Sequence, residues 1–65
     1  MSPYIKCRRY IEKATDPKTL YEDIRNILKA DERNYPEDHQ IKTLQRLADA
    51  KYAELTAAEE NAPTT

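Results

Sequence analysis

The sequence contains no glycine, valine, phenylalanine or tryptophan, and only one cysteine and one histidine among its 65 residues. Without glycine the chain cannot offer a phosphate-cradling loop of the usual kind, and its backbone is stiffer than that of a typical disordered polypeptide. A single thiol cannot form an internal disulfide, which fits a reducing compartment. One cysteine and one histidine also cannot complete a zinc site, which takes four nitrogen or sulfur ligands.

Long apolar runs are also missing, so we expect neither a secretion signal nor a membrane span and place the protein in the cytoplasm. Large aliphatic side chains number only ten. A core built from so few would leave a monomer marginally stable, because their burial returns less free energy than ordering the chain costs. Helical hydrogen bonds and dispersion must narrow that gap. A homo-oligomer or a partner surface is therefore expected.

The charge is nearly balanced, with eleven basic and twelve acidic residues and a net charge of −1. This balance argues against extensive nucleic-acid binding, which needs a clear positive excess. The charge is unevenly spread, however: residues 1–13 sum to +3 and residues 53–65 to −3. The asymmetry could steer a charged partner, and the alternative is a solvated surface whose ends differ in sign.

Prolines mark the starts of three expected helices, because a proline at the first helical position loses no hydrogen bond. Ser2-Pro3, Asp16-Pro17 and Tyr35-Pro36 predict helices over about residues 3–14, 17–31 and 36–58. Apolar residues recur with helical spacing in each. These stripes are Tyr4, Cys7, Ile11 and Ala14; Leu20, Ile24, Ile27 and Leu28; and Ile41, Leu44, Leu47, Ala48 and Leu55.

The predicted fold class is therefore all-α, a small three-helix protein made of a short helix and a helical hairpin. Links of two to four residues favour helices packed side by side. We expect a single domain over residues 1–60 and a disordered tail over residues 61–65. The third helix is the longest and should project beyond the first, where a second copy or a partner could pack.

No arrangement of residues demands catalysis. His39 is expected on the surface, and Cys7 in the core, although Arg8 and Arg9 beside it could lower its pKa and make it reactive. A core this small also leaves little room for a substrate pocket. We expect no enzyme, no cofactor and no metal ion, and a protein that works by binding another macromolecule.

Arg8 and Arg9 are the first candidate binding residues, and they form a short basic-aromatic patch with Tyr10 and Lys13. Such a patch could contact phosphate groups, but three or four charges give only weak, salt-sensitive binding. No helix-turn-helix pattern with a glycine in its turn supplies a recognition helix. Nucleic-acid binding is therefore expected to be weak if it occurs.

Asp49 and Tyr52 are the second pair of candidate binding residues. They lie one helical turn apart and off the apolar stripe, so they can contact a partner together. The alternative for Asp49 is an ion pair with Arg46 on the same helix. Tyr10 and Tyr21 also fall off the stripes, and tyrosine at such a position either packs over the core edge or belongs to an interface.

Two segments resemble the Hha/YmoA family, whose members are small enterobacterial modulators. They are residues 4–9, Tyr-Ile-Lys-Cys-Arg-Arg, and residues 48–56, Ala-Asp-Ala-Lys-Tyr-Ala-Glu-Leu-Thr. Thr19-Leu20 takes the place of a Thr-Leu helix start between them. The sequence departs from the family in having Asp49-Ala50 in place of an Asp-His pair, a longer second connection and no aromatic final segment.

This resemblance implies binding to the oligomerisation domain of the nucleoid protein H-NS. By the same resemblance, Asp49 matches the family's partner-binding aspartate, and Arg8 and Arg9 match its basic surface. We therefore interpret the chain as a small regulatory adaptor that binds a protein, with a transcription or nucleoid-associated factor as one form. The alternatives are a weak nucleic-acid-binding regulator that uses the basic first helix, and a structural subunit of a larger assembly.

Overall fold

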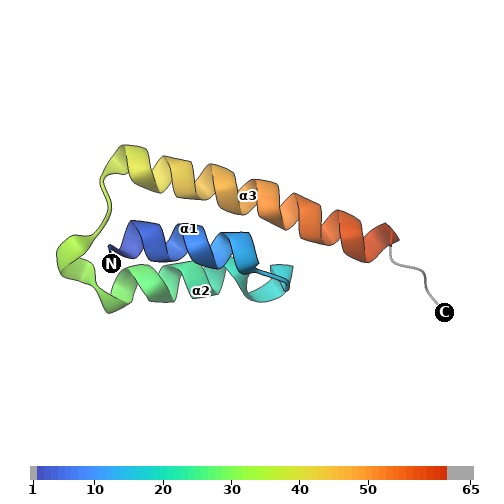
Figure 1. The fold of residues 1–65 in the computed structure, drawn as a ribbon, viewed down its shortest axis with the longest axis horizontal. Helices are drawn as coiled ribbons and strands as arrows, with labels where there is room; N and C mark the ends of the chain where they lie inside the picture. Colours follow the sequence, from blue (N-terminus) through green and yellow to red (C-terminus); the bar gives the residue numbers. More distant parts are fainter. Residues whose placement is uncertain (1, 62–65) are drawn as a thin grey trace.

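Three helices make up the protein in a computed structural model that describes the backbone of residues 2–61 and the side chains of residues 2–59. They are α1 (Pro3–Lys13), α2 (Pro17–Ala30) and α3 (Asp38–Asn61), with a short 3-10 helix, η1 (Glu32–Asn34), before α3. α2 and α3 form an antiparallel hairpin, and α1 packs against both (Figure 1). The predicted all-α class, a short helix plus a helical hairpin, is confirmed.

The first two helices begin where their prolines predict, because a side chain caps each one. The Ser2 hydroxyl accepts a hydrogen bond from the Ile5 N–H at 3.3 Å, and an Asp16 carboxylate oxygen accepts one from the Lys18 N–H at 2.9 Å. Both caps satisfy N–H groups that have no partner inside the helix. Pro3 and Pro17 then take the first helical positions.

The expected start of the third helix at Pro36 is wrong by two residues. α3 begins at Asp38, and the Gln40 side-chain oxygen accepts a hydrogen bond from the Glu37 N–H at 3.1 Å, as in a capping box. Pro36 is buried ahead of the helix. At its other end α3 continues to Asn61, which we expected in the tail, and residues 62–65 of that expected tail lie outside the described residues.

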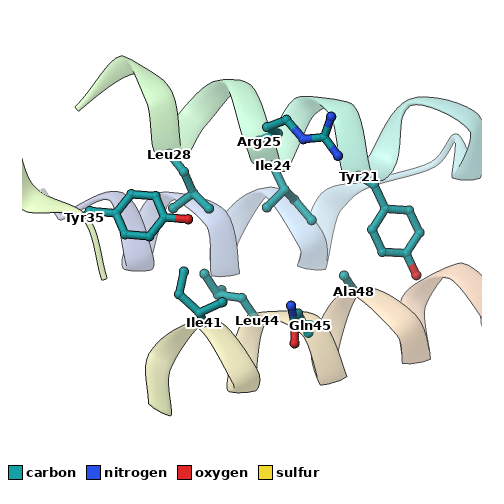
Figure 2. Close-up of a pocket in the computed structure, with 9 residues that line it drawn as sticks. All are labelled: Tyr21, Ile24, Arg25, Leu28, Tyr35, Ile41, Leu44, Gln45 and Ala48. Atoms are coloured by element: carbon teal, nitrogen blue, oxygen red, sulfur yellow. The ribbon is translucent and has the colours of Figure 1, made fainter. Parts of the chain in front are cut away.

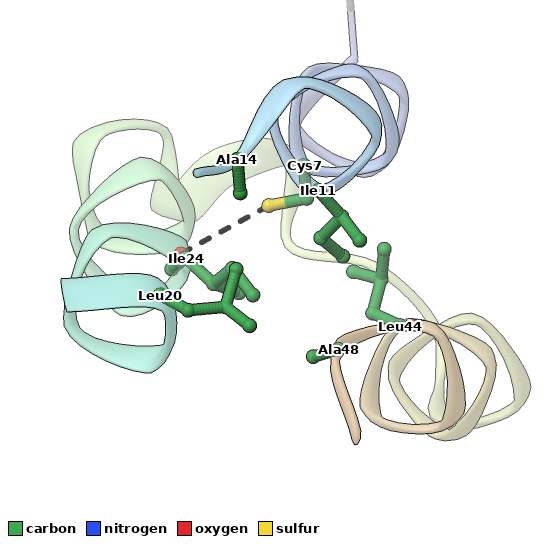
Figure 3. Packing of buried hydrophobic residues seen from close by; sticks show 7 residues of the cluster. All are labelled: Cys7, Ile11, Ala14, Leu20, Ile24, Leu44 and Ala48. Atoms are coloured by element: carbon green, nitrogen blue, oxygen red, sulfur yellow. Dashed lines mark hydrogen bonds between the residues drawn. The ribbon is translucent and has the colours of Figure 1, made fainter. Parts of the chain in front are cut away.

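The hydrophobic core lies where all three helices meet, and side chains from the two walls of the hairpin face each other there (Figures 2 and 3). Most members of the three predicted stripes are buried in it or pack at its edge. There are two exceptions: Leu47, of whose surface 38% stays exposed, and Ile41, which is half-buried at the groove. The buried members are Cys7, Ile11, Ala14, Leu20, Ile24, Leu44 and Ala48.

α3 is much longer than the helices it packs against, as predicted. Its 24 residues span about 36 Å at 1.5 Å per residue, against about 21 Å for the 14 residues of α2. Its C-terminal end runs past the α1–α2 connection (Figure 1). Within the described residues no helix is both long enough and apolar enough to cross a membrane.

Replacing Leu20 with alanine should destabilise the protein by about 2–5 kcal/mol, because the side chain is fully buried and its loss leaves a cavity. Urea unfolding followed by circular dichroism measures the change. Leu47→Ala is the matched control, and it should cost clearly less because Leu47 is partly exposed. Equal losses for both variants would contradict the position of the core.

Candidate functional site

An open groove of about 210 Å³ runs between α2 and α3 (Figure 2). Its floor is apolar, with the Tyr35 ring at one end and Tyr21 at the other. No residue of α1 lines it, because α1 covers the other side of the hairpin. The lining consists of Tyr21, Ile24, Arg25, Leu28, Tyr35, Ile41, Leu44, Gln45 and Ala48.

Polar groups lie along the rim of the groove. Arg25 on α2 and Gln45 on α3 both line it, and both side chains are exposed. A second open hollow continues past Arg25 toward η1 and adds Lys29 and Glu32 to the lining. The groove therefore combines an apolar floor with a hydrogen-bonding rim that includes positive charge, which is typical of a surface that accepts a protein segment.

The Tyr21 end of the groove holds two of the predicted partner-binding residues, Asp49 and Tyr52. The Tyr21 hydroxyl donates a hydrogen bond to Asp49 Oδ1, which joins α2 to α3. The Tyr21 and Tyr52 rings pack at a centroid distance of 5.6 Å and an interplanar angle of 45°. Asp49 and Tyr52 thus do lie together, but Tyr21 contacts both of them from the neighbouring helix.

The carboxylate of Asp49 holds the Tyr21 hydroxyl in its protonated form. The hydrogen bond to Asp49, followed by burial and by the negative charge of Asp49, raises the pKa of Tyr21 to about 12 from the usual 10. The alternative partner predicted for Asp49 was Arg46, and no ion pair joins these two residues in the described structure. Asp49 therefore acts first as a contact between helices.

Each pair of helices is joined by a polar side-chain contact of this kind. Tyr10 on α1 donates to Asp23 on α2 at 2.5 Å, and burial together with this bond raises the pKa of Tyr10. Lys51 on α3 donates to the Glu12 carbonyl oxygen near the end of α1 at 3.4 Å. With the Tyr21–Asp49 bond, these contacts join each helix to both of its neighbours.

Arg8 and Arg9, the other predicted partner-binding pair, lie apart from the groove. Both are exposed on α1, and the Arg8 guanidinium lies 5.7 Å from the centre of the Tyr4 ring. The structure therefore separates the predicted residues into a basic surface on α1 and an acidic-aromatic cluster at the end of the groove. It does not bring the two pairs together.

No feature of the sequence alone assigns Arg25, Tyr35 and Gln45 to the groove. The position of Arg25 and Gln45 at the groove depends on the rotation of α2 and α3, and that of Tyr35 on the path of the connection after η1. A single helix pattern contains neither. Tyr21 did carry a signal, because it falls off the apolar stripe of its helix. An off-stripe tyrosine could have been paired with an acid on a neighbouring helix, but nothing in the sequence identifies which acid.

The single cysteine and the single histidine lie in opposite surroundings, one buried and one exposed. Cys7 is fully buried, as expected of a core thiol, and burial raises the pKa of its thiol. His39 is exposed and contacts Glu37 at 2.8 Å. Within the described part of the chain, no group of three or more His, Cys, Asp or Glu residues could hold a metal ion.

Comparisons with protein-family models, with curated proteins and with solved structures found no match to this chain. The resemblance to the Hha/YmoA family therefore stays a prediction.

Raising the pH should weaken the Tyr21–Asp49 contact between about pH 10 and pH 12. Because the folded protein holds the Tyr21 proton more tightly than the unfolded chain does, the stabilisation is complete below pH 10 and is lost as the pH rises through about 12. The difference in unfolding free energy between wild type and Tyr21→Phe measures the stabilisation by the Tyr21–Asp49 contact. We expect roughly 0.5 kcal/mol at neutral pH, the lower end for a hydrogen bond, because the pair is exposed.

The comparison with Tyr21→Phe cancels the ionisation of the other four tyrosines, which both proteins share. Asp49→Ala should lower the pKa of Tyr21 toward 10, as read from the ultraviolet absorbance of the phenolate. A free-energy difference that stays constant across this pH range would show that the hydrogen bond does not stabilise the fold.

Proposed function

We propose that this chain is a small, non-enzymatic regulatory adaptor that binds another protein through the groove between α2 and α3. The observation that carries the proposal is the position of the exposed apolar side chains. Five large hydrophobic residues stay exposed in the described part of the chain. Of these, Tyr21 and Tyr35 line the groove and Tyr52 packs at its end. Exposed tyrosines gathered around one apolar groove favour a protein interface.

The shape of the groove suits an amphipathic helix from the partner. Two antiparallel helices leave a trough between them, and a third helix can lay an apolar face into it. Leu28 and Ile41 are only half-buried on the walls, so a partner side chain would cover surface that water now contacts. Arg25 on the rim favours a partner helix that carries a carboxylate beside its apolar residues.

The resemblance to the Hha/YmoA family adds one specific partner to this proposal, the oligomerisation domain of H-NS. Asp49 would then meet that partner together with the Tyr21 hydroxyl, since the two are hydrogen-bonded. A partner that binds there competes for the same carboxylate. Binding and the α2–α3 contact would therefore be coupled, which is one way in which an adaptor can respond to its partner.

Gln45→Arg should abolish partner binding without unfolding the protein. Gln45 is exposed and lines the groove, so a larger, charged side chain blocks the trough and leaves the core untouched. Asn26→Arg is the matched control, because Asn26 is an exposed amide on α2 outside the groove lining. We expect wild type and Asn26→Arg to capture the same proteins from host cells, and Gln45→Arg to lose them.

The binding constant of each captured protein, and of the H-NS oligomerisation domain, is then measured by calorimetry. We expect Gln45→Arg to weaken binding by at least about tenfold, or about 1.4 kcal/mol. Equal capture by all three proteins would remove the groove from the binding site.

A nucleic-acid-binding regulator is the second candidate function, favoured by the exposed basic residues of α1. Lys6, Arg9 and Lys13 are all exposed and follow one another at three- and four-residue spacing, which places them on one face of the helix. Arg8 lies beside this face. The stripe could follow a phosphate backbone, but its few charges support only weak binding.

Gel shifts at about 150 mM salt should therefore show no complex tighter than roughly micromolar, the non-specific range. Any shift should weaken further in an Arg8→Ala, Arg9→Ala variant, because phosphate contacts are lost. A nanomolar, sequence-dependent shift that disappears in this variant would favour the hypothesis of a nucleic-acid-binding regulator over that of a protein-binding adaptor.

A further inference from the structure

The face of α3 that lines the groove continues past the groove toward the C-terminus. Ile41, Leu44, Gln45 and Ala48 line it, and the same helical face carries on as Tyr52, Leu55, Thr56 and Glu59. α2 stands opposite the first half of this face but not its last turns, which run beyond the α1–α2 connection (Figure 1). One half of the face is thus a groove, and the other half is a projecting helix.

The two halves are related by a simple register. The register is centred on Ala50, because each groove position lies as far before it as one projecting position lies after it. The matched positions are 48 with 52, 45 with 55, 44 with 56, and 41 with 59. If two chains place their α3 helices antiparallel with the two Ala50 positions at the same level along the helix axes, the projecting half of each faces the groove of the other. Such a pairing is isologous and closes on itself, as a two-fold dimer must.

The charges of the two halves are complementary in this register. Glu59 would lie opposite Ile41, at the Tyr35 end of the groove. The adjoining hollow is lined by Arg25, Lys29 and Glu32, whose charges sum to one positive charge. Opposite charges at the two ends of one interface favour the antiparallel arrangement over the parallel one.

Near the two-fold axis the floor of the groove is Ala48, which is buried and has a small side chain. In this register Tyr52 of the second copy would lie over it, beside the Tyr21–Tyr52 ring pair of the first copy. Exposed rings from both chains would then cover each other, which removes the apolar surface that each single chain leaves in water.

We propose that the groove takes the C-terminal half of α3 from a second copy of this chain, giving an antiparallel two-fold dimer centred near Ala50. This inference rests on the proposed function, because it uses the same groove as a protein-binding surface. It also names a mode of regulation: the second copy and the regulatory partner compete for the groove. Partner binding would then convert the dimer into a complex that contains one copy.

The test is a charge reversal read by sedimentation equilibrium. Lys29→Glu and Glu59→Lys should each weaken dimerisation by about tenfold or more, since each replaces two attractive contacts per dimer with two repulsive ones. An equimolar mixture of the two variants should dimerise as tightly as wild type, because the mixed dimer restores both opposite-charge pairs. Lys18→Glu, a reversal on α2 outside the groove, is the control and should dimerise like wild type.

A mixture that associates no better than the single variants would overturn the proposed register. We expect a dimer Kd of roughly micromolar, so wild type that stays monomeric at roughly 100 μM would overturn the dimer itself. Circular dichroism checks that each variant is folded. We expect that they are, because the substituted residues are exposed. If the chain is monomeric but Gln45→Arg still abolishes partner capture, only the dimer proposal is contradicted. If Gln45→Arg changes neither capture nor dimerisation, the proposal that the groove binds proteins is contradicted as well.

Discussion

The close approach of three helices on small side chains is the constraint on which the rest of the structure depends. Cys7, Ala14 and Ala48 are buried where larger residues would hold the helices apart. The Cys7 sulfur lies 3.9 Å from the Ile24 carbonyl oxygen on the next helix (Figure 3). Because the core holds few large side chains, only tight contact between helices can fill it at normal density.

The same shortage of apolar residues leaves the second side of the hairpin open. α1 is short and covers one side of α2 and α3, and the chain has no fourth helix in its described part to cover the other. The exposed tyrosines remain at that uncovered side, where each ring can be half-buried while its hydroxyl reaches a polar partner. The groove and the thin core are therefore two consequences of one composition.

The helices and their buried faces could be predicted from the sequence, because both depend on local features. Ser2 and Asp16 cap the first two helices directly before a proline, and the periodic apolar residues mark the faces that are buried. The third start was misplaced because Tyr35-Pro36 looks like the other two sites, whereas the capping hydrogen bond forms between Glu37 and Gln40. Of the candidate site, Asp49 and Tyr52 were identified, but not the residue that joins them.

The sequence by itself determined three helices, their order and the residues that face the core, since capping and periodicity act over three or four neighbouring positions. The tertiary structure alone decided that Tyr21 meets Asp49, 28 positions further along the chain, and that a groove opens beside them. These features depend on how far each helix is rotated and shifted against its neighbours. That rotation is set by the packing of Cys7, Leu20 and Ala48 in one shared core, which no single segment of the sequence contains.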